Sequence, residues 1–428
     1  RNHFWRLLIN QEKILTQRLF LLIKVLRWGC FLTSGCMALA FAAAAYLGTL
    51  VPDTLRVVSG GDVRLVSLPL LTQQAGTEQA APASGLETGS SYNLSIALGG
   101  IIPVKTVRAQ VVSRRLVNVC GTPFGIKMFA DGAMVVGFSD LHTSTGTVNP
   151  AKAAGIAMGD VIKSVAGTPT KTNEDVAAAL QELEGAPAEV VYTRGTKEYT
   201  TLLTAVYDSA AQMWRTGMWV RDSSAGIGTL TFVDEATSMF AGLGHSIHDV
   251  DTGLTVSLRS GEIVRVDITG VVKGAQGSPG ELQGHFQNAA PAGTILENGE
   301  SGVYGTVSAA LGGFEAEVAL PQEIEAGPAL MYTTIRGEEA AAYEVEIEKI
   351  ALAGEDPNRN MIVRVTDERL LSETGGIVQG MSGSPIVQNG RLVGAVTHVL
   401  VNDPTRGYAI FAENMVEAAD AAARKTAA

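Results

Sequence analysis

The sequence has few cysteines and few charged side chains. Its three cysteines, among 428 residues, are too few for a disulfide framework or a cysteine-based metal cluster. Charged residues make up 18% of the chain, the net charge is −11, and no basic stripe follows the N-terminus, which argues against nucleic-acid binding. A His-Glu-x-x-His run is absent as well, which disfavours a zinc metallopeptidase of that type. We therefore expect no metal and no cofactor.

Helical periodicity is also scarce in the second half of the chain, whereas glycine, with 48 residues, is abundant. From residue 213 onward the sequence is typical of short strands separated by glycine, with no long helix before 412–423. This stretch is long enough for two small β-barrels packed together. We expect a mainly β protein in which residues 207–428 form an all-β domain.

The N-terminal segment divides into a basic part and an uncharged part. Residues 1–28 carry six Lys or Arg side chains and one acid, and residues 29–51 carry no charge. The uncharged run is long enough to cross a bilayer as a helix, with 1–28 cytoplasmic and the bulk of the chain outside. A cleaved signal peptide is the alternative, because Ala40-Phe41-Ala42 resembles a cleavage site. The long basic and apolar segments favour an uncleaved anchor.

Residues 52–116 are expected to hold a linker and a short β segment. The part from 73 to 91 is rich in Ala, Gly, Ser, Thr and Gln, which is typical of a flexible spacer. Residues 117–206 then alternate strands with two helices. The longer helix is expected at 173–183, with Thr172 as its N-cap.

The run "NPAKAAGIAMGDVIKSVAG", which begins at Asn149, resembles the core signature of PDZ domains. Such domains bind an extended peptide as an added strand and often capture its terminal carboxylate. The resemblance places the peptide-binding loop at 121–126, and a spacer domain without a ligand is the alternative. The residues assigned to peptide binding are Gly121, Phe124, Gly125 and Ile126.

A small-residue turn, Gly380-Met381-Ser382-Gly383-Ser384-Pro385, precedes a strand, an Asn-Gly turn and a second strand. A serine flanked by glycines can expose its hydroxyl, and the same turn lets backbone N–H groups converge as an oxyanion hole. An ordinary loop beside a buried hairpin is the alternative interpretation.

A serine nucleophile needs a general base and a group that orients the base. Four histidines follow residue 206, and residue types alone leave the choice among them open. The candidates for the base are His245, His248, His285 and His398, of which His245 lies in a glycine-rich turn. The candidates for the carboxylate are Asp249, Asp251 and Asp367, and the first two also fit an Asx turn.

The turn at 380–385 resembles the Gly-x-Ser-Gly-x-Pro turn of chymotrypsin-like serine peptidases, which makes Ser382 rather than Ser384 the nucleophile. The chain is more specifically similar to SpoIVB-type peptidases (stage IV sporulation protein B). This resemblance rests on "GLGHSIHDVDTG" from Gly242, "VTDERLLSETGGIVQGMSGSPIVQNGRLVGAVTHVLVNDPTRGY" from Val365, "GGIIPVKTV" from Gly99, and the order anchor, PDZ, peptidase.

The resemblance implies a triad of His245, Asp367 and Ser382, with the amides of Gly380 and Ser382 as oxyanion donors. It also implies a chymotrypsin-like double barrel at 207–428 and a strand at 394–397 that pairs with the substrate. The family's role is self-cleavage and cleavage of the extracytoplasmic part of a regulator of an intramembrane metallopeptidase. That role operates in sporulation, at the forespore inner membrane. An inactive membrane-tethered PDZ scaffold and a PDZ serine peptidase outside sporulation are the alternatives.

Overall fold

The computed structural model describes residues 2–58, 65–73, 87–143, 146–287, 290–308, 312–354 and 356–427. The chain divides into two compact units, residues 1–113 and 114–428. Most of the expected spacer, residues 74–86, lies outside the described residues.

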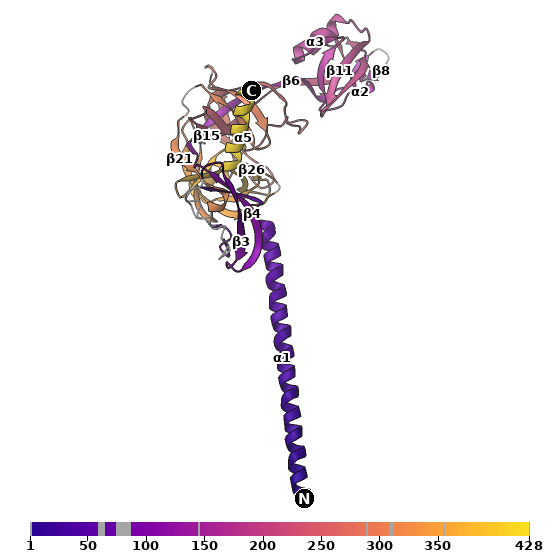
Figure 1. Cartoon of the computed structure of the whole chain (residues 1–428). Coiled ribbons are helices and arrows are strands. Elements are labelled where there is room, and N and C mark those ends of the chain that lie inside the picture. The colour runs from indigo at the N-terminus through magenta and orange to yellow at the C-terminus, as the bar shows by residue number, and fades with distance from the viewer. Residues whose placement is uncertain are drawn as a thin grey trace. The chain divides into compact units, whose positions relative to one another are not determined.

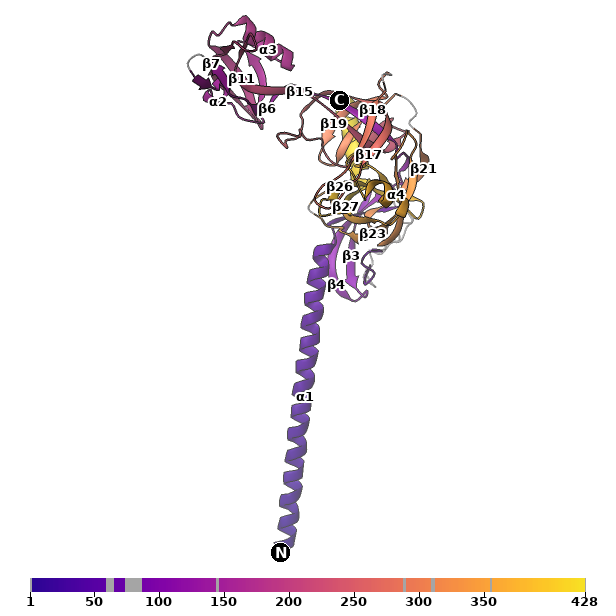
Figure 2. The same ribbon diagram turned by 180° about the vertical axis from the view of Figure 1, so that it is seen from behind.

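The first unit combines one long helix with a small sheet (Figures 1 and 2). Helix α1 (Asn2–Leu50) includes a part, Leu26–Leu50, that is long and apolar enough to cross a membrane. The sheet that follows has four strands, where a linker with a short β segment was expected. Its order is β1 (Thr54–Val58), β4 (Ile102–Val112), β3 (Ser91–Leu98) and β2 (Leu71–Gln73), and only the β1–β4 pair is parallel.

The second unit contains two barrels, each a closed ring of six antiparallel strands. The first ring is β6 (Pro123–Phe138), β17 (Leu258–Val272), β19 (Gly293–Gly299), β20 (Gly302–Val307), β16 (Met239–Gly242) and β15 (Met218–Asp234). The second ring is β22 (Gly327–Thr333), β23 (Ala341–Ile350), β24 (Met361–Val365), β27 (Asp403–Phe411), β26 (Arg391–Leu400) and β25 (Pro385–Gln388). The expected double β-barrel is therefore confirmed as an architecture, although one strand of the first barrel, β6, comes from outside the expected residues 207–428.

Each barrel encloses its own apolar core, because its strands turn every second side chain inward. Phe124, Phe240 and Ile263 lie in the first core, and Met331 and Val363 lie in the second. Two further strands pair with each other and link the barrels, since one pairs with β15 and the other with β26. These strands are β5 (Leu116–Val119) and β21 (Phe314–Val318).

The PDZ-type module is inserted into the first barrel rather than placed before it. Strand β6 leaves the barrel and β15 returns to it, and their outer parts form a ribbon in which residues 134–138 pair with 218–221. There β6 also pairs with β9 (Val161–Val165), and β11 (Ala188–Arg194) and β12 (Lys197–Leu203) complete the sheet. Helices α2 (Pro150–Ala153) and α3 (Asn173–Glu182) cover it, and Thr172 caps α3 with a capping box as expected.

This arrangement overturns the expected peptide-binding loop. Phe124, Gly125 and Ile126 lie in the barrel part of β6, paired with β15 and β17, and Gly121 lies against Tyr332 of the second barrel. The PDZ boundary expected at residue 117 is displaced for the same reason, because 116–130 pair with barrel strands. The strand predicted at 124–129 is present, but its pairing partners are the barrel strands β15 and β17.

The other short elements are β7 (Leu141–Thr143), β8 (Gly146–Val148), β10 (Thr168–Pro169), β13 (Val206–Asp208), β14 (Met213–Arg215), β18 (Glu281–Phe286), the 3₁₀ turn η1 (Pro321–Glu323), α4 (Glu368–Thr374) and the C-terminal helix α5 (Ala412–Ala427). Helix α5 packs four buried side chains into an apolar cluster shared with β5 and β16, namely Ala412, Met415, Ala419 and Ala422.

Candidate active site

Residues of both barrels line one cleft of about 740 Å³. His245 follows β16 of the first barrel, and Ser382 immediately precedes β25 of the second. The cleft brings together the expected nucleophile, the expected base and one expected oxyanion donor. Its polar lining includes His245, His248, Gln379, Gly380, Ser382, Thr397 and His398.

The turn that carries Ser382 has five consecutive backbone carbonyls, 379–383, and each accepts a hydrogen bond. The donors are, in order, Leu282 N at 2.8 Å, Thr229 Oγ1 at 2.8 Å, Ser384 N at 2.9 Å, Thr229 N at 2.9 Å and Thr231 Oγ1 at 2.7 Å. Three of these bonds come from β15, whose Thr229 and Thr231 are almost fully buried. The nucleophile turn is therefore fastened to a strand of the other barrel.

Two of these hydrogen bonds, to the carbonyls of Gln379 and Met381, orient the two expected oxyanion donors, the N–H groups of Gly380 and Ser382. In a trans peptide the N–H and C=O groups point in opposite directions. The hydrogen-bonded carbonyls of Gln379 and Met381 therefore direct the N–H groups of Gly380 and Ser382 to the opposite side of the chain. Within the described part of the chain, the N–H groups of Gly380 and Ser382 donate to no backbone carbonyl. Both are thus free to receive a developing oxyanion, as the sequence predicts.

Gly383 explains why this turn needs small residues. Its φ is +93°, and a Cβ atom there would lie 2.0 Å from Thr229 O and 2.5 Å from Leu243 N. No side chain fits in that space, so only glycine allows the turn to approach both β15 and the histidine turn.

The two serines of the turn have different surroundings. Ser382 lines the cleft, and its Oγ donates a 2.7 Å hydrogen bond to Thr397 O on β26. Ser384 is fully buried, and its Oγ has no hydrogen-bond partner. Of these two serines, only Ser382 lines the cleft and has a hydroxyl that a substrate there can reach.

The imidazole of His245 is held in the form that suits a general base. Its Nδ1 lies 2.8 Å from the backbone oxygen of Ser246. A carbonyl oxygen can only accept, so Nδ1 carries the proton and Nε2 keeps a free lone pair. A backbone carbonyl therefore fixes the imidazole tautomer, which is one of the two roles of the carboxylate in the usual triad. The same oxygen also accepts from His248 Nδ1 at 3.1 Å.

His398 lies beside His245, with the ring centroids 4.6 Å apart and the planes tilted by 35°. Burial, and then the neighbouring His245, lower the pKa of His398 to about 4. Its imidazole is therefore neutral at physiological pH. His398 lines the cleft, while the group that orients His245 is the carbonyl of Ser246, which accepts from His245 Nδ1.

Asp367, the expected carboxylate, does not reach this cleft. It is the N-cap of α4 and accepts from the backbone N–H of Arg369 at 2.9 Å and of Glu344 at 3.2 Å. The Arg369 guanidinium also donates to it, at 2.6 Å, and together these bonds lower its pKa to about 2. Both oxygens are thus engaged in bonds that do not involve His245, and Asp367 is not among the residues that line the cleft, so the structure does not bring the expected triad together.

The other two candidate carboxylates are also engaged elsewhere. Asp249 accepts from the N–H groups of Asp251 and Thr252, so it forms the Asx turn that was the alternative interpretation. Both Asp249 and Asp251 pair with the guanidinium of Arg221. His285 lies on β18 and is not among the residues that line the cleft.

Three features of the site were missed at the sequence level. They are the Ser246 carbonyl, the two threonines of β15 and the short helix α4. The threonines do leave a signal, because positions 229 and 231 are two apart and share one face of a strand. Nothing local indicates which turn they contact, since residue 382 lies some 150 positions further along the chain.

We expect Thr229→Val to lower kcat by about 10²-fold with little change in KM, because the unpinned Gly380–Met381 peptide misplaces the oxyanion donors. Steady-state kinetics on a fluorogenic peptide measures the effect. Thr333→Val is the matched control, because Thr333 is equally buried but its Oγ1 has no partner. Equal kinetics for the two variants would contradict a positioning role for Thr229.

The acid limb of the pH profile should lie below pH 6.5. Burial, and to a smaller extent His248, lower the pKa of His245 from 6.5, despite the opposing bond to Ser246. Only the neutral imidazole can accept the serine proton, so activity is retained until the pH falls through this lowered pKa. A plot of log kcat/KM against pH measures the limb, and a midpoint above 6.5 would count against His245 as the base.

Residues 212–416 match the family model described as SpoIVB peptidase S55. No curated protein matches the chain. One similar solved structure is the PDZ domain of an SdrC-like protein from Listeria monocytogenes. It is 16% identical, with a TM-score of 0.18, and the match covers 21% of this chain and 87% of that one.

Proposed function

We propose that the chain is a serine peptidase in which Ser382 and His245 form the catalytic pair, because residues 212–416 match the family model described as SpoIVB peptidase S55. The single observation that carries the proposal is the fastened turn. Its five bonded carbonyls leave the N–H groups of Gly380 and Ser382 free, in the cleft that also holds the His245 imidazole. A loop that merely connects two strands has no need of free and aligned amides.

In this mechanism, Ser382 Oγ leaves Thr397 O and turns its proton toward His245 Nε2. As Oγ attacks the substrate carbonyl carbon, His245 takes the proton and the amides of Gly380 and Ser382 bind the oxyanion. His245 then protonates the leaving amine, and water hydrolyses the acyl-enzyme by the reverse proton path. The Ser246 carbonyl holds the imidazole tautomer throughout.

The cleft favours an extended, uncharged segment of protein near the bond that is cut. Its apolar lining includes Ile227, Ile377, Val378 and Val399, and Arg221, its one charged lining residue among those described, is paired with two aspartates. The carbonyl of Thr397 lies on β26, where it can accept from a substrate N–H once Ser382 has turned away.

The wider role is part of the same proposal. We propose a single-pass membrane peptidase, anchored by α1 with its bulk outside the cytoplasm, that cleaves itself and a regulatory membrane protein in sporulation signalling. The apolar helix and the peptidase family support this role. The PDZ-type module would recruit the target by binding an extended peptide.

Labelling with a fluorophosphonate tests the function directly. The full chain in detergent is treated with the probe and digested, and the modified residue is located by mass spectrometry. We expect the adduct on Ser382 and none on Ser384. A correctly folded chain that takes up no probe would instead support a PDZ scaffold without peptidase activity.

A further inference from the structure

The last turns of α1 are packed against the sheet of the first unit. Ala44 is 4% exposed, and Ala40, Leu47 and Gly48 are half-buried, so the covered positions recur at the spacing of one helix face. Strand β4 supplies the contact, because a Cβ atom on Gly48 would lie 3.4 Å from Val104 O. Both views of the ribbon show β3 and β4 beside the C-terminal end of α1 (Figures 1 and 2).

Followed toward lower residue numbers, β4 runs from the C-terminal end of α1 toward the N-terminus of α1. Lys105 Nζ donates to Val51 O at 2.6 Å, and Val104 lies beside Gly48, so lower numbers in β4 meet lower numbers in α1. From Val104 to Ile101 a strand advances about 10 Å, which equals about seven residues of helix. Ile101 is therefore level with residues 41–44 of α1.

That level lies inside the apolar segment. A helix needs about 20 apolar residues to cross the hydrocarbon core, and α1 offers Leu26–Leu50. A span that begins at Leu26 ends near residue 45. The turn between β3 and β4 therefore reaches the outer boundary of the bilayer core when α1 spans it.

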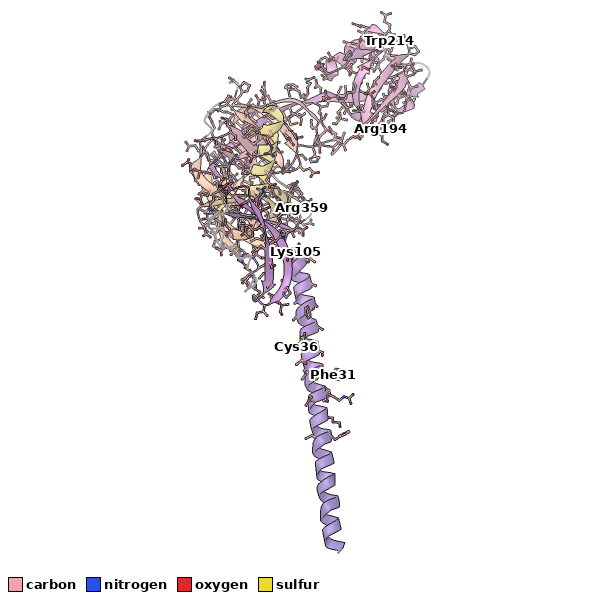
Figure 3. The ribbon with its side chains drawn as sticks, in the orientation of Figure 1. Phe31, Cys36, Lys105, Arg194, Trp214 and Arg359 are labelled. Atoms are coloured by element: carbon pink, nitrogen blue, oxygen red, sulfur yellow. The ribbon has the colours of Figure 1, made fainter. Side chains whose placement is uncertain are left out.

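The chemistry of this tip fits lipid. Ile101 is 80% exposed and Leu70 is 68% exposed, and Gly99 N donates to Leu70 O at 2.9 Å, which holds the two loops together. The sequence from 94 to 104 carries no charge. Charge begins with Lys105, which pairs with Asp53 at 2.8 Å just beyond the helix end (Figure 3).

We propose that Leu70 and the β3–β4 turn, residues 99–101, insert into the outer leaflet beside α1. The first unit is then a membrane-seated base rather than a loose tether. It meets the bilayer at two places, the helix and the tip, so its sheet cannot turn freely about α1. Lipid acyl chains are the occupant of the exposed apolar surface of Ile101 and Leu70. This inference rests on the proposed membrane span of α1.

Site-specific fluorescence in proteoliposomes tests the insertion. The full chain carries Cys30→Ser, Cys36→Ser and Ile101→Cys, and an environment-sensitive NBD label is attached, since Cys120 is buried. We expect a blue-shifted emission that nitroxides on the lipid acyl chains quench at least fivefold more strongly than at Asn93→Cys. Asn93 is an exposed site on β3, about 17 Å further from the tip.

A second label separates this proposal from the anchor. The native Cys36, exposed on α1 (Figure 3), is labelled with Cys30 replaced by serine. Quenching at Cys36 but no more at Ile101→Cys than at Asn93→Cys would overturn the inserted tip and leave the anchor in place. No quenching at Cys36 would overturn the membrane span of α1, and the tip proposal with it. Labelling of Ser382 is unaffected by either outcome.

Discussion

Ser382→Ala is expected to lower kcat for peptide-bond cleavage by a factor on the order of 10⁴ to 10⁶. The methyl group has no lone pair to attack a carbonyl, and no other hydroxyl of the turn reaches the cleft. KM should change little, since the lining of the cleft is untouched. Assays of the purified full chain with a fluorogenic peptide, at high enzyme concentration, measure the residual rate.

Ser384→Ala is the matched control for this prediction. It lies two residues away in the same turn, and its Oγ makes no hydrogen bond, so its removal breaks no bond. We expect a variant that stays close to wild-type activity and stability. Comparable losses in both serine variants would mean that the turn had been disturbed rather than the nucleophile removed. Full activity in Ser382→Ala would end the catalytic assignment.

The sequence predicts the structure correctly where a local pattern determines the local geometry. The Asn389-Gly390 turn has both φ angles positive, at +52° and +76°, which is the geometry of the tight hairpin predicted between β25 and β26. Glycines around Ser382 and His245 identified the two turns that meet in the cleft. Strand patterns likewise gave two barrels, because alternation of apolar residues records which face is buried.

The predictions differ from the structure where one sequence pattern is compatible with two structures. Asp367 comes before Glu368 and eight residues before Gly375, which is also the pattern of an N-cap and a left-handed C-terminal glycine on a short helix. The triad followed from the resemblance to SpoIVB-type peptidases, and the cap was not among the alternatives for Asp367. A backbone carbonyl has no residue type, so the role of Ser246 could not be read from the sequence. The strand at 124–129 was assigned to the module that follows it, since sequence does not name pairing partners.

His245→Ala and Asp367→Asn are expected to act on different properties of the protein. The first removes the base, and kcat should fall by a factor on the order of 10⁴ to 10⁶. The second keeps a side chain that caps α4 well but loses the ion pair with Arg369, so kcat should stay within about tenfold of wild type. In a carboxylate-dependent triad the same change would cost about 10⁴-fold. Single-turnover rates on the folded variants separate the two cases.

The free energy of unfolding of Asp367→Asn is a second measurement that tests the role of this carboxylate. Its neighbours lower the pKa of Asp367 from 3.8 to about 2. A depressed acidic pKa gives stability that is present above 3.8 and is lost as the pH falls through 2. Urea unfolding should therefore show a less stable variant at pH 7, and the difference should shrink steadily below pH 4. If instead stability is equal at pH 7 and kcat falls by about 10⁴-fold, the carboxylate serves His245, and the Ser246 carbonyl does not hold the base alone.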